Sequence, residues 1–188
     1  MRFRWPSLIQ GLLLAPCLFA QPLPPTRFER SGGLETPRLA ETMLECRALA
    51  KASSWVSETS FGKGPQGREL PLVIVDKDRH FDPSSAKASG KAIVMIQACI
   101  HAGECEGKDA GILFLRDLVV TKKFAPLLDR LTFLFIPIFN VDGHERFGAF
   151  NRINQNGPKE MGWRTNATNL NLNRDYLKAD APEMRAWP

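Results

Sequence analysis

Ala92-Ile93-Val94-Met95-Ile96 is the stretch that decides the fold, because five consecutive apolar residues are typical of a strand buried on both faces. Apolar residues then recur at helical spacing over residues 107–120, and residues 131–136 form a second run of strand-forming residues. A strand, a helix and a strand in this order predict a right-handed crossover between parallel strands. We therefore expect an α/β domain with a mostly parallel or mixed sheet flanked by helices, in which residues 92–96 are a central strand.

The segments around this unit also have recognisable patterns. Residues 37–52 predict an amphipathic helix that begins at a proline. Residues 70–75 predict a strand at a sheet edge or a strand start, because Pro71 has no amide proton to donate. We expect a surface loop over residues 76–90, a long polar and functional loop over residues 139–178, and a helix that begins at residues 180–183.

The amino-terminal residues have the layout of a secretory signal. Arg2 and Arg4 precede an apolar stretch over residues 8–19, and Ala20 provides a small residue for cleavage. The apolar stretch is too short to span a bilayer comfortably. We therefore expect a signal peptide over residues 1–20 and no stable membrane span.

A lipoprotein signal is the alternative, with Cys17 as the lipid-bearing residue. Pro16 directly before this cysteine fits such a signal poorly. We favour export to the periplasm or the cell exterior, with a proline-rich lead over residues 21–35 and one domain over residues 36–188.

Charge and composition argue against a nucleic-acid partner. The 188 residues carry a formal charge of +5, which falls to +3 when Arg2 and Arg4 leave with the signal. The basic residues are scattered and are not interleaved with aromatic residues, so we expect the charge to favour solubility.

Cysteines are few after the signal is removed. Cys46, Cys99 and Cys105 remain, and an odd set of three allows one disulfide at most. An exported protein can form a disulfide, although ordinary buried thiols fit these positions equally well.

Ile100-His101-Ala102-Gly103-Glu104 follows the first predicted strand and contains the chemistry-bearing pair. Zinc binds imidazole and carboxylate readily, and a catalytic zinc takes three protein ligands and a water molecule. Ligands of parallel sheets gather at the carboxyl ends of strands, where residues 140–143 also fall. An isolated pair of this kind can also simply cap a helix.

Three further motifs accompany the pair, namely Asn140-Val141-Asp142-Gly143, Gly162-Trp163-Arg164 and residues 169–175. The order and spacing of the four blocks resemble the zinc carboxypeptidases of the carboxypeptidase A type, including bacterial members with the same His-Ala-Gly-Glu sequence. The resemblance covers most of the chain after the signal. It implies the carboxypeptidase A-like fold, also described as phosphorylase/hydrolase-like, a Zn²⁺ cofactor, and a peptide substrate with a free C-terminal carboxylate.

The resemblance assigns a role to five residues. It implies that His101 and Glu104 are zinc ligands and that Arg164 polarises the scissile carbonyl. It also implies that Asn173 and Arg174 bind the terminal carboxylate of the substrate. The activity that follows is removal of a C-terminal residue by metal-activated water. For either arginine, the alternative is a solvated surface charge, and residues 140–143 are expected to form a turn.

Other reactive residues match no ligand or catalytic position of the family. We expect structural roles for them, including a small buried side chain at Cys105 and a solvated one at His80. This set comprises His80, Cys105, His144, Glu160, Asp175, Tyr176 and Glu183.

The resemblance also predicts what is missing. In the family, a histidine after a later strand is the third ligand, and a still later glutamate is the general base; neither position exists before Pro188. We therefore expect the amino-terminal portion of such an enzyme, truncated at its C-terminus, with residues 93–96 partly uncovered. A deacylase or esterase on the same scaffold, and a non-catalytic binding protein or inactive fragment, are the alternatives.

Overall fold

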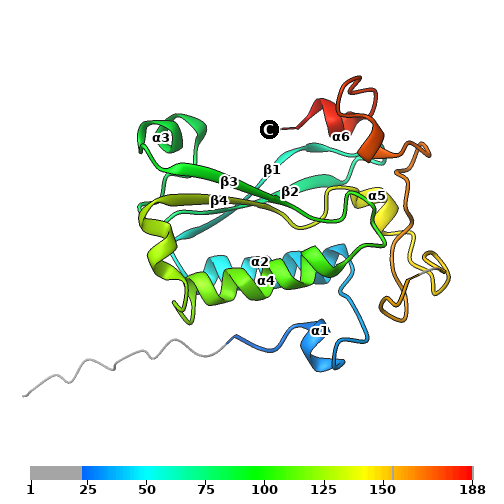
Figure 1. The fold of residues 1–188 in the computed structure, drawn as a ribbon, viewed down its shortest axis with the longest axis horizontal. Helices are drawn as coiled ribbons and strands as arrows, with labels where there is room; N and C mark the ends of the chain where they lie inside the picture. Colours follow the sequence, from blue (N-terminus) through cyan, green and yellow to red (C-terminus); the bar gives the residue numbers. More distant parts are fainter. Residues whose placement is uncertain (1–22, 154, 188) are drawn as a thin grey trace, which may run out of the picture.

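The sheet of this domain has four strands and mixed pairing. The computed structural model describes residues 23–153 and 155–187, so the expected signal peptide over residues 1–20 lies outside the described part. Strand β1 pairs with β2 and β2 with β4 in antiparallel fashion, whereas β3 and β4 are parallel. The order is β1-β2-β4-β3 (Figure 1), with β1 (Val56–Lys63), β2 (Glu69–Val75), β3 (Ala92–Gln97) and β4 (Leu131–Ile136).

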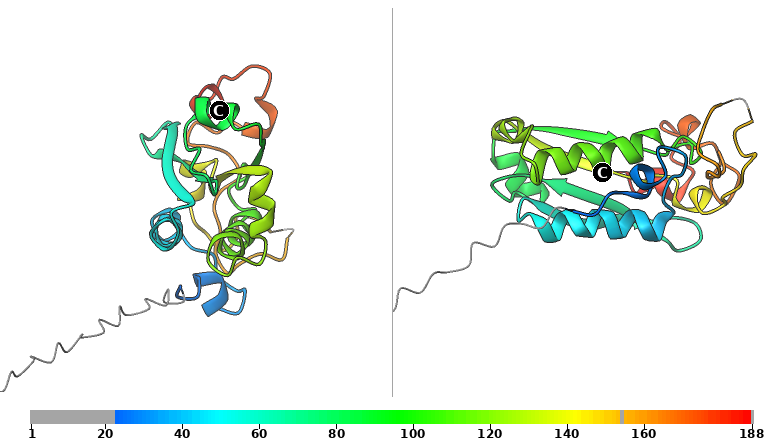
Figure 2. Two further views of the ribbon diagram at one scale, coloured as in Figure 1. Left: turned by 90° about the vertical axis from the view of Figure 1, so that its left-hand side faces the viewer. Right: turned by 90° about the horizontal axis from the view of Figure 1, so that it is seen from below.

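Two long helices cover one face of this sheet. Helices α2 (Leu39–Ala52) and α4 (Glu106–Val119) lie side by side along it (Figure 2), and α1 (Arg27–Arg30) lies beneath them. The remaining short helices lie at the sheet ends and near the other face. They are α3 (Pro83–Ala88), α5 (Val141–His144), α6 (Pro182–Arg185) and the 3-10 turns η1 (Ala125–Asp129) and η2 (Leu172–Arg174).

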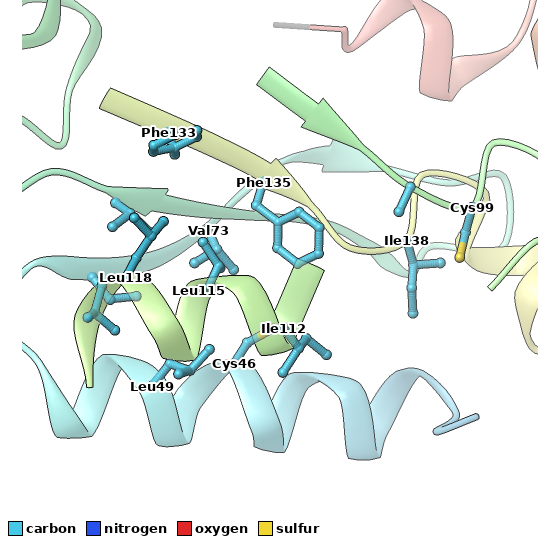
Figure 3. Close-up of a cluster of buried hydrophobic side chains, with 14 of the residues drawn as sticks. Cys46, Leu49, Val73, Cys99, Ile112, Leu115, Leu118, Phe133, Phe135 and Ile138 are labelled. Carbon is cyan, nitrogen blue, oxygen red and sulfur yellow. The ribbon is translucent and has the colours of Figure 1, made fainter. Parts of the chain in front are cut away.

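The main hydrophobic core lies between the sheet and the two long helices (Figure 3). Leu115 and Leu118 of α4 are fully buried there, together with Val73 and Phe135 of the sheet. At Gly111 an added Cβ would lie 2.4 Å from the Phe135 ring, so only glycine lets α4 approach β4 this closely. The predicted helices and the predicted parallel pairing of residues 92–96 with 131–136 are thus confirmed.

Within the described residues, the prediction that residues 92–96 are a central strand is wrong. Strand β3 lies at the sheet edge, where Ile93 is 48% exposed and Val94 is 36% exposed, as expected for a partly uncovered strand. The strand buried along nearly its whole length is β2. An apolar run shows that a strand is apolar, but its place in the sheet depends on which strands pair on either side.

Two smaller predictions can also be compared with the structure. Of the two predicted places for Pro71, a sheet edge or a strand start, the structure shows the second: β2 is interior, but Pro71 lies near its start, before the Val73–Val75 stretch that pairs with β4 and close to the β1 bulge between Ser60 and Gly62. The expected surface loop over residues 76–90 contains α3, whose first turn Asp82 caps by accepting hydrogen bonds from two backbone amides. In the described residues, no helix combines the length and apolar character needed to cross a bilayer.

Asp76 fastens the ends of three strands together. Its carboxylate follows β2, is fully buried, and accepts hydrogen bonds from Thr132 Oγ1 in β4 at 2.6 Å and from Lys91 Nζ before β3 at 3.1 Å. Burial by itself raises the pKa of Asp76, but the hydrogen bonds from Thr132 and Lys91, and from the backbone amides of His80 and Asp78, lower it to about 2.

We predict that this carboxylate makes the fold sensitive to acid. Because the pKa in the folded state lies below the ordinary value of 3.8, the stabilisation is complete above that value and is lost as the pH falls from 3.8 towards 2. Asp76→Asn should lower the free energy of unfolding at neutral pH by roughly 2 kcal/mol and remove this part of the pH dependence. Urea denaturation followed by tryptophan fluorescence at neutral pH and at pH 3 measures both effects.

Asp82→Asn is the matched control, because asparagine also caps a helix. We expect it to be nearly neutral. Equal losses in the two variants at neutral pH would contradict the role of Asp76.

Candidate functional site

The hydrogen bonds between β3 and β4 continue beyond both strands. The Ala98 amide donates to Ile136 O at 2.9 Å, the Phe139 amide to Ala98 O at 3.0 Å, and the Asn140 amide to Cys99 O at 3.1 Å. The segment that carries His101 is thereby fixed against the segment that begins at Asn140. This is the carboxyl end of the parallel strand pair, where the sequence placed the site.

The turn at residues 140–143 holds the Gly162-Trp163-Arg164 motif in place. Asn140 Oδ1 accepts a hydrogen bond from the Gly143 amide at 2.9 Å, and its Nδ2 donates to Arg164 O at 3.2 Å. Gly143 O accepts a hydrogen bond from the Trp163 amide at 2.8 Å. The turn therefore holds the backbone of Trp163 and Arg164, so it shapes the site as expected.

Two glycines let the loops touch. A Cβ on Gly103 would lie 2.8 Å from Gly162 O and 2.7 Å from Arg152 Cγ, and one on Gly162 would lie 2.8 Å from Ala102 O. No side chain fits between these backbones, so the loop of His101 and the loop of Arg164 come into direct contact.

His101 lies between two acceptor oxygens. The residue is 6% exposed, with Nδ1 at 3.1 Å from Glu104 Oε1 and Nε2 at 3.1 Å from Asn171 Oδ1. That amide oxygen also accepts from the Asn173 backbone N–H at 3.1 Å, which sets its orientation. A neutral imidazole carries one N–H, so only one of the two ring contacts can be a hydrogen bond. When Nε2–H donates to Asn171, the lone pair of Nδ1 faces the carboxylate oxygen Oε1 with no proton between them. A cation held by both atoms would remove this repulsion, so the pair fits a metal ion.

Two arginines surround the carboxylate of Glu104. Its Oε1 lies 2.8 Å from Arg152 Nη1 and 3.8 Å from Arg164 Nη1. Burial raises the pKa of Glu104, but the hydrogen bond from Arg152 and the charge of that guanidinium outweigh it and keep the pKa below its ordinary value. The carboxylate is therefore ionised at neutral pH, as metal binding requires.

The expected substrate-binding pair lies farther along the chain. Arg174 is exposed and its Nη1 donates to Asn173 O at 2.8 Å. Asn173 is connected to the site through Asn171, which accepts its amide and faces His101. The structure thus brings His101, Glu104 and Arg164 together, and it connects Asn173 of η2 to His101 through the Asn171 side chain. The contact described for Arg174 is with Asn173 O.

Sequence reasoning missed two residues of this site. Asn171 belongs to the asparagine-rich block, and its two-residue spacing from Asn173 was a usable signal. Arg152 lies in an irregular loop, and nothing in the sequence indicated its contact with Glu104.

The described residues contain two other groups with metal-ligand chemistry: Asp76, Asp78 and His80 form one, and Cys99, Cys105 and His144 form the other. The ammonium of Lys91 lies 3.1 Å from Asp76 and 2.6 Å from Asp78, so the first group already has its cation. His80, expected to be solvated, instead lies 3.2 Å from Asp76.

Comparison with known proteins gives the family. The sequence profile described as zinc carboxypeptidase matches residues 44–185. The chain belongs to the zinc carboxypeptidase family. The expected family and the carboxypeptidase-like mixed fold are therefore confirmed.

Solved structures with a similar fold are also carboxypeptidases. Carboxypeptidase A from Helicoverpa armigera has 20% identity and a TM-score of 0.61, over 81% of this chain and 41% of that one. The metallo-carboxypeptidase from Burkholderia cenocepacia has 22% identity and a TM-score of 0.58, over 79% of this chain and 36% of that one. The metallo-carboxypeptidase from Pseudomonas aeruginosa has 21% identity and a TM-score of 0.55, over 78% of this chain and 34% of that one. The chain thus spans less than half the length of these three proteins.

The contact between Gly103 and Gly162 gives a testable prediction. Gly103→Ala should lower the melting temperature by several degrees, because its Cβ meets the backbone oxygen of Gly162, which can move only with the loop of Arg164. Differential scanning fluorimetry measures the shift.

Gly157→Ala is the control on the neighbouring loop, since its Cβ meets only the flexible end of Met161 at 3.2 Å. A Gly103→Ala protein as stable as this control would show that the two loops do not pack as described.

Proposed function

We propose that this chain carries part of the active site of a zinc metallocarboxypeptidase, in which His101 and Glu104 hold the metal. The observation that carries the proposal is the approach of His101 Nδ1 to Glu104 Oε1 at 3.1 Å, with Asn171 Oδ1 behind the ring at 3.1 Å. An acceptor behind the imidazole orients a metal-binding histidine and fixes its tautomer. Family membership makes hydrolysis the expected chemistry.

A zinc ion at this position would supply an electrophile and make a water molecule more acidic. No third His, Cys, Asp or Glu of the described residues joins His101 and Glu104 in a metal-binding group. Two protein ligands hold zinc less tightly than the three of a catalytic site. We therefore propose weak zinc binding for the chain by itself.

Arg164 supports the peptidase proposal. Its guanidinium lies 3.8 Å from Glu104 Oε1, and the Asn140 side chain holds its backbone. A cation fixed beside the metal ligands can polarise a substrate carbonyl and stabilise the negative charge that develops there.

Asn173 and Arg174 are proposed to bind the C-terminal carboxylate of a peptide. A guanidinium fork suits a planar carboxylate, and exposure of Arg174 leaves it accessible to substrate. The P. aeruginosa relative was solved with (2-guanidinoethylmercapto)succinic acid, which bears carboxylates. Export is part of the same proposal and rests on the pattern of residues 1–20.

We predict that zinc binding depends on His101 and Glu104. Zinc titration against a chromophoric chelator should show weak binding that His101→Ala and Glu104→Gln each reduce at least tenfold. His80→Ala, in the Asp76 cluster, is the control and should bind as the parent does. A loss in His80→Ala with retention in His101→Ala would place the metal elsewhere.

Cobalt substitution tests the ligand type independently. We expect cobalt(II) bound by imidazole and carboxylate to lack the intense near-ultraviolet band of thiolate ligation. A thiolate band would assign the metal to Cys99 and Cys105 and contradict the proposal.

A second prediction concerns the substrate carboxylate. Arg174→Ala should weaken the binding of an N-acylated dipeptide with a free carboxylate by about tenfold or more, of the order expected for losing a charged hydrogen bond to the ligand. It should have little effect on the binding of the corresponding C-terminal amide, and isothermal titration calorimetry measures both. Arg79→Ala, a surface variant, is the control, and an equal loss with both ligands would contradict carboxylate binding.

A further inference from the structure

Two buried cysteines lie at the ends of the loop that carries His101 and Glu104. Cys99 is 4% exposed and follows β3, and Cys105 is 2% exposed and is the N-cap residue of α4. Their sulfurs and a ring nitrogen of His144 all lie within 4.8 Å of one another. Both thiols are free in the structure.

The hydrogen bonds of the thiols turn both sulfurs into this loop. Cys99 Sγ donates to Glu104 O at 3.5 Å, and Cys105 Sγ donates to Ala102 O at 3.6 Å. The Cys99 carbonyl accepts the Asn140 amide at 3.1 Å, which fixes this end of the loop against the end of β4. The loop therefore holds the sulfurs near each other by its own backbone contacts.

A metal ion is a poor explanation for this cluster. The fully buried Lys108 ammonium lies 3.1 Å from His144 Nε2 and also donates to Pro37 O. His144 Nδ1 lies 3.1 Å from Glu145 Oε1, so both ring nitrogens already have partners. A metal would have to displace a buried ammonium or lie directly beside its charge.

Cys46 is a poor partner for either sulfur. It is fully buried on α2, and Figure 3 shows it under α4 and apart from Cys99. Among the described residues, Cys46 is also absent from the cluster of Cys99, Cys105 and His144, whose ligand atoms lie within 4.8 Å of one another. Of the three pairings open to Cys46, Cys99 and Cys105, the structure favours one.

We propose that Cys99 and Cys105 are a redox pair that forms a disulfide across the His101–Glu104 loop. With glutathione disulfide as oxidant, one protein thiol attacks a glutathione sulfur, and one reduced glutathione leaves. The second protein thiol attacks the resulting mixed disulfide, and a second reduced glutathione leaves. The protein loses two electrons and two protons, which the two glutathione molecules carry.

The disulfide would stabilise the loop that positions the proposed metal ligands. Cross-linking residues close in sequence removes conformational entropy from the unfolded chain, and here the linked ends lie on either side of His101 and Glu104. The link to metal binding rests on the proposed function, whereas disulfide formation does not.

The test is refolding of the full chain in a glutathione redox buffer, followed by alkylation of free thiols and tryptic mapping. Trypsin cuts after Lys91 and Lys108, so Cys99 and Cys105 fall in one peptide, separate from Cys46 and Cys17. We expect that peptide to lack both alkyl groups and to be lighter than the reduced peptide by two hydrogen atoms. Cys46 should be alkylated. The same buffer with denaturant should give a lower yield of the linked peptide.

Two results would overturn the proposal: alkylation of both cysteines after refolding, or an equal yield with and without denaturant. A phosphine reductant should lower the melting temperature of the oxidised chain by several degrees, as expected for loss of a cross-link. The same reductant should not change the melting temperature of the Cys105→Ser variant. Equal changes in the melting temperatures of the parent chain and the variant would contradict a structural disulfide.

Zinc titration of the oxidised and reduced chains separates this inference from the proposed function. A linked peptide without His101-dependent zinc binding in either form would support the disulfide and refute the metal site. Zinc binding that depends on His101, without a linked peptide, would support the metal site and refute the disulfide.

Discussion

The whole site depends on the parallel pairing of β3 with β4 and on its continuation past the strand ends. The ladder register ends at Gln97 and Ile136, yet backbone hydrogen bonds go on to join Ala98 with Phe139 and Cys99 with Asn140. Every later contact of the site builds on this alignment. A slip of the ladder would move His101 away from the loop that carries Arg152 and from the Asn171 amide.

In addition to its apolar clusters, the protein buries two carboxylates, in α5 and α6, that have hydrogen-bond partners. Asp142 is fully buried and accepts from Arg68 Nη1 at 2.6 Å and from the Gln66 amide at 2.9 Å, which ties α5 to the β1–β2 turn. Glu183 is also buried, and burial raises its pKa while Asn166 donates to it at 3.3 Å. Such groups are costly without partners, so they hold the surrounding loops in specific positions.

Local patterns predicted the elements of the fold better than their arrangement. The limits of the 92–97 and 131–136 strands and of the α4 helix follow from apolar runs and helical spacing. The strand over Val56–Lys63 has no such pattern, because its side chains are mostly half-buried or exposed. The interior places of β2 and β4 and the edge place of β3 in the described sheet are set by long-range pairing, which no local pattern contains.

The candidate site also contains residues that the sequence indicated and residues that only the folded structure shows. His101, Glu104 and Arg164 were identifiable because they lie in motifs whose order resembles a known family. Arg152 comes from a loop without periodicity, and only the folded chain brings it to Glu104. The family match covers residues 44–185 and therefore includes all four motifs.

The group behind His101 is an amide, and this affects how fast a bound metal would exchange. Asn171 Oδ1 faces Nε2 at 3.1 Å as a neutral acceptor. A carboxylate at this place would draw the ring proton more strongly and make Nδ1 a better electron donor. An amide orients the ring without that added basicity. Metal at this histidine would therefore leave to a competing chelator sooner than from a carboxylate-backed imidazole.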